Sequence, residues 1–352
     1  MILFDCHQLG LMSRVAVVRD GVHIVDLSRR NQNIAIDRSP VRSSLIKSNP
    51  SSNHSATRER WLYELIHEEA GTVSEHVPCM QHDGDSLLSI EYFPGAISIN
   101  QLIERDAAFP IKTASELGTW LGALHTAKEL QIGVLQPSVS GELPWALFVD
   151  QPTTNLIHSS SGATIRLLRT VQQHPDICDA LMELRECWVR DSLIHNDLKW
   201  DNIIILRPSI EAANDFMVID WELAGLGDSR WDVGSIFAAF LTLWVGSIPI
   251  MRDAPPDHLL DFARHPITLL QPAIQSFWSA YIESTRLRQT IDRPDIEPIM
   301  RFCGARLIQI AIERAQLNST LAADSVVLLQ VAQNIFRQPR QAASSLFALP
   351  TM

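Results

Sequence analysis

The sequence predicts an α+β fold with two lobes, a small antiparallel-sheet lobe in residues 1–93 and a large, mostly helical lobe in residues 94–352. Short β-branched runs separated by turn residues dominate the chain as far as Phe93, a pattern typical of an antiparallel sheet. After Phe93-Pro94-Gly95 the apolar residues recur at helical spacing instead. With 352 residues the chain is long enough to bury a core in each lobe.

The sheet of the first lobe is predicted from several short runs. Two of them flank Asp20-Gly21, a dipeptide that favours a tight hairpin turn, and another pair is joined across residues 82–85. A Ser- and Asn-rich stretch precedes apolar residues at helical spacing, which predict a helix over 57–68 with Ser55 or Thr57 as its cap. The expected strands cover residues 14–19, 22–27, 34–36, 45–46, 77–80 and 87–92.

The second lobe is predicted to be helical except for one strand pair. Residues 130–163 are rich in Ser, Pro, Gly and Thr, so we expect loops there. The expected helices cover residues 113–128, 165–171, 177–189 and most of the chain from Asp232 onward. The expected strands cover residues 203–206 and 216–219.

One apolar segment in this lobe approaches the length of a membrane span. Residues 233–250 carry no charged side chain. Glycine, serine, threonine and proline within the segment dilute its hydrophobicity, so we expect a buried core helix and not a membrane span.

Composition excludes several other classes of protein. The formal net charge is −11, with 40 acidic and 29 basic residues, so we expect no nucleic-acid partner. The five cysteines form no CxxC pair or Cys/His cluster, which argues against a zinc site or a disulfide framework. The first residues include Asp5 and no basic region, unlike a signal peptide. We therefore expect a cytoplasmic protein without a membrane partner.

The residues that carry chemistry lie beside the predicted strand pair of the second lobe. His195–Asn202, with the sequence HNDLKWDN, precedes the first strand, and Asp220 follows the second. Phosphoryl transfer needs a carboxylate to orient the acceptor hydroxyl and take its proton, together with oxygen ligands for magnesium. Asp197 can act as that carboxylate, while Asn202 and Asp220 provide the hard oxygen ligands that Mg²⁺ prefers. The pattern therefore predicts phosphoryl transfer from a magnesium-bound nucleotide.

HNDLKWDN resembles the HxDxxxxN catalytic loop of the aminoglycoside phosphotransferase and choline kinase superfamily, which is related to protein kinases. Ile219–Glu222 (IDWE) resembles the metal-binding aspartate of that group, and the likeness extends from about Ile24 to Leu241. The resemblance implies a two-lobed, protein-kinase-like fold. Its first lobe would bind the nucleotide, and its second lobe would carry the catalytic loop and bind the acceptor.

The same resemblance implies roles for further residues of the second lobe. His195 is expected to pack beneath the catalytic loop and Asp232 to brace it, and His125 is expected to be a packing residue. Glu222 is expected to support the metal through a water molecule. Lys199, which protein serine/threonine kinases also have at this position, is expected to stabilise the transferring phosphoryl group.

In the first lobe the resemblance implies a nucleotide site. Lys47 matches the strand lysine that contacts the α- and β-phosphates. Its helix partner is Glu59 or Glu64, and Glu59 is favoured because the apolar residues that follow it then match the family's helix face. The segment that matches the hinge between the lobes, whose backbone groups hydrogen-bond adenine, comprises Glu91, Tyr92 and Phe93.

The expected phosphate-covering loop departs from the kinase pattern. Leu27–Asn33 (LSRRNQN) contains no glycine, although kinases commonly use glycine there so that backbone amides can approach phosphate. Alternatively, the Asp20-Gly21 hairpin is the covering loop.

Together these observations predict an ATP- and Mg²⁺-dependent phosphotransferase that moves the γ-phosphate to an alcohol hydroxyl of a small molecule or peptide. Two alternatives stay open. One is a peptide Ser/Thr kinase of a lanthipeptide-type maturation pathway, which Lys199 favours. The other is a catalytically weak, nucleotide-binding pseudokinase, which the glycine-free loop favours. A variant of the main interpretation transfers AMP instead of phosphate. The acceptor and the oligomeric state are not predicted.

Overall fold

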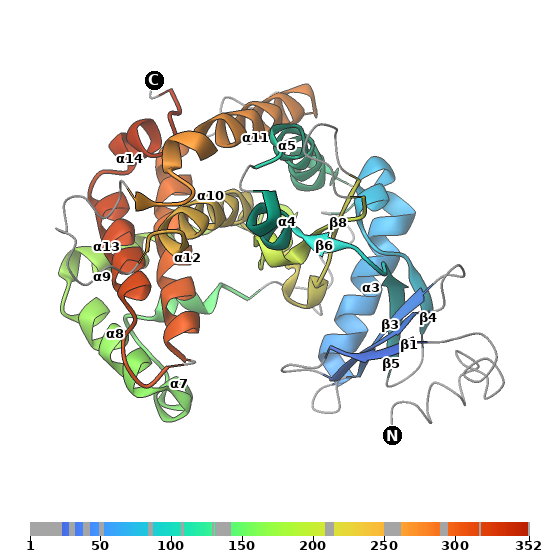
Figure 1. Ribbon diagram of the computed structural model, residues 1–352, viewed down its shortest axis with the longest axis horizontal. Coiled ribbons are helices and arrows are strands. Elements are labelled where there is room, and N and C mark those ends of the chain that lie inside the picture. Colours follow the sequence, from blue (N-terminus) through green and yellow to red (C-terminus); the bar gives the residue numbers. More distant parts are fainter. Residues whose placement is uncertain are drawn as a thin grey trace.

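The computed structural model describes residues 23–27, 32–37, 43–48, 53–83, 87–106, 109–128, 130, 142–207, 215–249, 262–288, 295–316 and 318–350. Figure 1 shows a sheet with one long helix beside it at one end of the molecule and a larger group of helices at the other. The expected α+β architecture with two lobes is confirmed. The boundary at residue 93 stays a prediction.

The sheet of the small lobe has five antiparallel strands in the order β1-β2-β3-β5-β4. The predicted strand over 77–80 is wrong by three residues, since the chain enters the sheet only at Met80. The predicted strand at 14–19 and the Asp20-Gly21 turn lie outside the described residues. The strands are β1 His23–Asp26, β2 Gln32–Asp37, β3 Ser43–Ser48, β4 Met80–Asp83 and β5 Leu87–Tyr92.

One helix, α3 (Asn53–Glu69), packs against this sheet (Figure 1). Leu62, Tyr63 and Ile66 are fully buried on one face of this helix, and the helical spacing had predicted the helix itself. Glu59 is one turn before them on the same face and is also buried. The helix starts before Ser55, so the predicted cap is wrong. The 3₁₀ turn η1 (Gly71–His76) follows the helix.

Two short sheets in the large lobe position the motif residues. The three-stranded sheet has the order β6-β8-β9, and the predicted hairpin is its antiparallel pair β8 and β9. The two-stranded sheet pairs β7 with β10. The strands are β6 Ile97–Ser98, β7 Ser192–Ile194, β8 Ile203–Ile205, β9 Phe216–Val218 and β10 Gly225–Gly227. The 3₁₀ turns beside them are η4 Trp200–Asn202 and η5 Trp221–Leu223.

Helices form the rest of the large lobe, as predicted. They are α4 Ile99–Asp106, α5 Ile111–Thr126, α7 Thr154–Ser159, α8 Gly162–Gln172, α9 Pro175–Glu186, α10 Ser229–Gly246, α11 Ile267–Arg288, α12 Ile296–Gln316, α13 Ala323–Arg337 and α14 Pro339–Ser345, with the 3₁₀ turn η3 Trp145–Phe148. Two short helical segments, α7 and η3, lie in the region 130–163 where we expected loops. Glycine allows α5 and α11 to approach closely: a Cβ atom on Gly118 would lie 2.2 Å from the Phe277 carbonyl oxygen.

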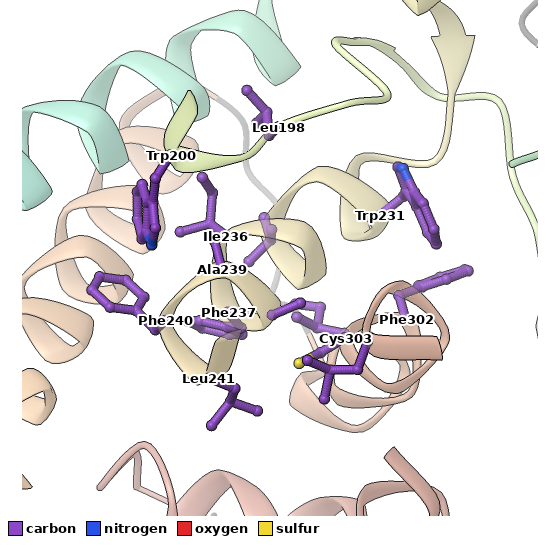
Figure 2. Packing of buried hydrophobic residues seen from close by; sticks show 14 of the residues in the cluster. Leu198, Trp200, Trp231, Ile236, Phe237, Ala239, Phe240, Leu241, Phe302 and Cys303 are labelled. Atoms are coloured by element: carbon purple, nitrogen blue, oxygen red, sulfur yellow. The ribbon is translucent and has the colours of Figure 1, made fainter. Parts of the chain in front are cut away.

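Helix α10 covers most of the uncharged segment 233–250, and most of its residues are buried. The expected core helix is therefore confirmed. It packs against α12, and aromatic residues fill their contact, as Figure 2 shows for Trp231 and Phe302. In the described part of the chain, no helix combines the length and the apolarity needed to cross a membrane.

Candidate active site

The segment His195–Asn202 runs from β7 to β8 and is held by a buried histidine. The His195 side chain is fully buried, and its Nε2 atom donates to the Ile219 carbonyl oxygen at 3.0 Å. Its Nδ1 atom accepts a hydrogen bond from the Asp197 backbone N–H at 3.3 Å. Both ring nitrogens hold backbone groups, so His195 makes the contacts of a packing residue.

A second buried group, the Asp232 carboxylate in the first turn of α10, braces the start of the segment. It accepts hydrogen bonds from the backbone N–H groups of His195 at 2.7 Å and Asn196 at 3.0 Å. Asn196 has a φ of 67°, in the left-handed region that costs energy for a residue other than glycine. The two hydrogen bonds from Asp232 stabilise that conformation. Behind them, His125 Nε2 lies 3.4 Å from Asp232 Oδ2, and His125 Nδ1 lies 3.1 Å from the Tyr281 hydroxyl.

Asp197 lies between two cations. Lys199 Nζ donates to its Oδ2 atom at 2.6 Å, and Arg306 Nη2, from α12, donates to its Oδ1 atom at 2.6 Å. Burial raises the pKa of Asp197, but the charges of Arg306 and Lys199 outweigh burial and lower the pKa to about 2. The carboxylate is therefore ionised at neutral pH, and 13% of its side chain stays exposed. It can accept a hydrogen bond from an incoming hydroxyl.

Asn202 is oriented by the same aspartate. Its Nδ2 atom donates to the Asp197 carbonyl oxygen at 2.9 Å and to Asp197 Oδ2 at 3.2 Å. The amide oxygen, on the opposite side of the amide group, is therefore turned away from Asp197. The neighbouring Trp200 anchors the turn η4 in the core. Its ring centroid lies 4.8 Å from that of Phe240 and 4.9 Å from that of Phe109. Figure 2 shows Trp200 beside Phe240 of α10.

The remaining motif residues join the two lobes. Lys47 Nζ, on β3, donates to Glu59 Oε1 on α3 at 2.7 Å and to Asp220 Oδ1 at 3.0 Å. Burial lowers the pKa of Lys47, but the negative charge of Glu59, with Tyr63 and Asp220, raises it well above its ordinary value. Lys47 therefore places a positive charge beside Asp220, the residue that follows the end of β9. Glu64, the other partner considered from the sequence, is half-buried elsewhere on α3.

Asp220 and Glu222 bring carboxylates to the same place. Asp220 follows β9 with φ 70° and ψ 61°, a left-handed conformation that turns the chain sharply. Glu222 lies in the following turn η5, where burial and then the charge of Asp220 raise its pKa. A bound cation would relieve this repulsion between carboxylates.

The oxygen donors present suit magnesium. The Asn202 amide oxygen and the Asp220 carboxylate are hard ligands, and Mg²⁺ bound with a nucleotide usually takes one or two carboxylates, substrate phosphates and several waters. Among the described residues no three His, Cys, Asp or Glu side chains converge as in a dedicated metal site. Asn202 and Asp220 supply two oxygen ligands, which fits a magnesium ion that is also held by nucleotide phosphates and waters.

The segment expected to be the hinge lies at the end of β5. Tyr92 is paired with Ser43 of β3, and the Glu91 N–H donates to the Cys79 carbonyl oxygen at 2.8 Å. The Phe93 carbonyl oxygen accepts a hydrogen bond from Ala96 at 3.2 Å. Glu91, Tyr92 and Phe93 are half-buried, and the chain passes from them to β6 in the large lobe. Adenine recognition by their backbone groups stays a prediction.

The structure thus brings Asp197, Lys199 and Asn202 into one cluster and Lys47, Glu59 and Asp220 into another. Sequence reasoning missed Arg306, which contacts the first cluster. An arginine within the long apolar run of α12 was a possible signal, because such a side chain is rarely buried without a partner. Most of the glycine-free loop, residues 28–31, lies outside the described residues.

Comparison with known proteins adds a family and a fold. The family model described as the phosphotransferase enzyme family matches residues 47–254, more than half of the chain. The comparison with curated proteins gives no match.

Among solved structures, the chain is similar to a choline kinase from Cryptosporidium parvum Iowa II, with 12% identity, a TM-score of 0.52 and coverage of 97% of this chain and 95% of that chain. This likeness shows the fold. Choline kinase LicA from Streptococcus pneumoniae has 13% identity and a TM-score of 0.49 over 94% and 99% of the two chains. Macrolide 2'-phosphotransferase MphH from Brachybacterium faecium has 15% identity and a TM-score of 0.47 over 99% and 100%.

Proposed function

This chain belongs to the phosphotransferase enzyme family, and we propose that it transfers the γ-phosphoryl group of ATP to an alcohol hydroxyl. The observation that carries the proposal is the meeting of two clusters from distant parts of the chain. Lys47 of the small lobe lies 3.0 Å from Asp220, and Asp197 lies 3.2 Å from Asn202, and both clusters lie at the same end of the β8–β9 pair. Division into a nucleotide-binding lobe up to residue 93 and an acceptor-binding lobe after it is part of this proposal.

In this mechanism the acceptor hydroxyl donates a hydrogen bond to Asp197, which orients it and takes its proton as phosphoryl transfer proceeds. Lys47, fixed by Glu59, contacts the α- and β-phosphates. Lys199 is 2.6 Å from the carboxylate that holds the hydroxyl, so it can reach the phosphoryl group during transfer and stabilise its charge. These groups act by position and charge, which is what phosphoryl transfer requires of a protein.

Magnesium, when bound, neutralises charge on the phosphates. The side chains that would hold it are Asn202 and Asp220, and Glu222 would support it through a water molecule. The adenine would contact the backbone at Glu91, Tyr92 and Phe93. These assignments rest on the chemistry of the donor atoms and on the family to which the chain belongs.

Substitution of Asp197 and Asp220 tests the proposal. We expect Asp197→Ala and Asp220→Ala each to lower Mg·ATP consumption with an acceptor by about 10²-fold or more. Asp201→Asn is the matched control, because Asp201 lies in the same segment but is exposed and bonded to Asn100 at 2.9 Å. Its turnover should be unchanged.

A thermal shift with Mg·ATP measures nucleotide binding separately from turnover. Binding without product from any acceptor would favour the pseudokinase interpretation. Full turnover in either alanine variant would contradict the assignment of the site.

A further inference from the structure

Arg306 is the feature of the site that the proposed mechanism does not use. Its side chain is 1% exposed, yet it carries a permanent positive charge on α12. Its only hydrogen bond among the described residues is from Nη2 to Asp197 Oδ1 at 2.6 Å, and its Nε and Nη1 atoms are buried without a partner there. A guanidinium group has five N–H donors, so most of its hydrogen-bonding capacity is unused.

Buried N–H groups of a charged side chain are costly to leave without a hydrogen bond, because the charged group has lost its hydration. A residue that served only to hold Asp197 would need a single donor. One turn later on the same helix, Gln309 is 5% exposed, and its Oε1 atom also lacks a partner among the described residues. Two adjacent side chains on one helix face therefore present unused polar atoms beside the catalytic carboxylate.

The position of Arg306 limits which groups can bind its unused N–H donors. The acceptor hydroxyl must lie within hydrogen-bonding distance of Asp197, about 3 Å, and Arg306 Nη2 is itself 2.6 Å from that carboxylate. The hydroxyl and Nη2 of Arg306 are therefore at most about 8 Å apart, even if the hydroxyl binds the other oxygen of the carboxylate. A group bound by the free N–H donors is a few covalent bonds from the reacting hydroxyl.

We propose that Arg306 binds an anionic group of the acceptor, a carboxylate or a phosphate, so that the substrates are small alcohols that carry this group a few bonds from the hydroxyl. The inference rests on the proposed function. Arginine suits this role because its planar donors match the oxygens of both groups. Through Nη2 it keeps Asp197 in place, and through Nη1 and Nε it selects the acceptor.

The test compares alcohols that differ only in the anionic group: glycerate and glycerol 3-phosphate against glycerol, each with Mg·ATP. The decisive variant is Arg306→Lys, which keeps a positive charge for Asp197 but removes the extra donors. Arg306→Gln removes the charge as well. Arg314→Gln is the matched control, since Arg314 is on the same helix and pairs with Asp324 at 2.7 Å, away from the site.

In the native enzyme we expect one anionic alcohol to exceed glycerol in kcat/KM by about 10- to 100-fold, as one or two charge-assisted hydrogen bonds would give. The ratio should fall towards one in Arg306→Lys and Arg306→Gln, with KM for ATP unchanged, and should persist in Arg314→Gln. Equal use of glycerol, or a ratio that Arg306→Lys leaves intact, would overturn the inference. A rise in KM for ATP would do so too, because the anion would then be the nucleotide.

A binding measurement decides the matter if these three alcohols are poor acceptors. Acetate and inorganic phosphate, added to the enzyme with a non-hydrolysable ATP analogue and Mg²⁺, should raise the melting temperature of the native enzyme and of Arg314→Gln but not of Arg306→Lys. An unchanged melting temperature of the native enzyme would mean that only water binds the unused N–H donors of Arg306. That result would overturn the inference. The proposed function fails separately, by absence of Mg·ATP binding or consumption.

Discussion

Replacement of the loop brace, Asp232→Asn, separates the contribution of this carboxylate to stability from its contribution to catalysis. In the native protein one carboxylate group accepts two buried backbone hydrogen bonds, from His195 at 2.7 Å and Asn196 at 3.0 Å. Asparagine has the same shape but only one acceptor atom. Its NH₂ group would face one of the two N–H groups, so two buried donors would oppose each other.

The magnitude follows from these contacts. Each hydrogen bond to the carboxylate contributes about 1.5–3 kcal/mol, and a buried donor without a partner costs about 1–3 kcal/mol. We therefore expect Asp232→Asn to lower the free energy of unfolding by about 3–5 kcal/mol. Because Asn196 is then less well held at its φ of 67°, the neighbouring Asp197 should shift. A shift of about 1 Å can cost about 10²-fold in turnover of the folded enzyme.

Urea unfolding followed by tryptophan fluorescence gives the free energy, and Mg·ATP consumption in the absence of urea gives the turnover. Asp228→Asn is the control: Asp228 is fully buried and caps the same helix, accepting from the Arg230 N–H at 3.0 Å. That variant should be destabilised but should keep its turnover. A change below about 1 kcal/mol in Asp232→Asn, or unchanged turnover, would refute the role of Asp232 as a brace.

Three further predictions follow from the site and the fold. The folded-state pKa of Asp197 is about 2, below its ordinary 3.8, so its ionisation adds about 2 kcal/mol of stability above pH 4 that is lost as the pH falls towards 2. In unfolding measurements the difference between the native protein and Asp197→Asn should shrink over that range, and a constant difference would contradict this. Glu59→Gln should lower kcat/KM for ATP about 10-fold, because Lys47 loses the charge that fixes it; steady-state kinetics with varied ATP would disprove this by showing native values. Gly118→Ala should destabilise the protein by about 1–3 kcal/mol, because the new Cβ meets the Phe277 carbonyl oxygen at 2.2 Å; an unchanged melting temperature would show that α5 and α11 separate easily.

Local signals predicted the elements that hold the motif. The strand pair over 203–206 and 216–219 followed from apolar runs, and its antiparallel pairing explains why Asn202 and Asp220 lie at one edge. The ends of the helices and strands were predicted less accurately. Several Ser and Asn residues near position 53 can each cap a helix, so the start of α3 did not follow from the sequence. Likewise Pro78 lies within the predicted strand 77–80, and the strand begins only after it, since proline has no N–H to donate.

Arg306 shows what local patterns cannot predict. It is 109 positions from Asp197 in the chain, and α12 is apolar on most of its faces, so spacing along the helix does not single out the face that meets the site. The tertiary packing of α12 against the large lobe, including α10, brings the two side chains together. Lys47 and Asp220 are 173 positions apart, yet both were singled out from the sequence as site residues, because each matched a motif of the family. Arg306 matched none.

The central claim is that the enzyme moves the γ-phosphoryl group and that Asp197 orients the hydroxyl that receives it. Incubation with ATP labelled at either the α- or the γ-phosphate, with glycerate or glycerol 3-phosphate as acceptor and Mg²⁺ present, tests it most directly. We predict that label passes to the acceptor only from γ-labelled ATP, and that Asp197→Asn, which preserves shape but not charge, lowers this transfer by about 10²-fold or more. Transfer of the α-label, or full transfer of the γ-label by Asp197→Asn, would contradict the claim.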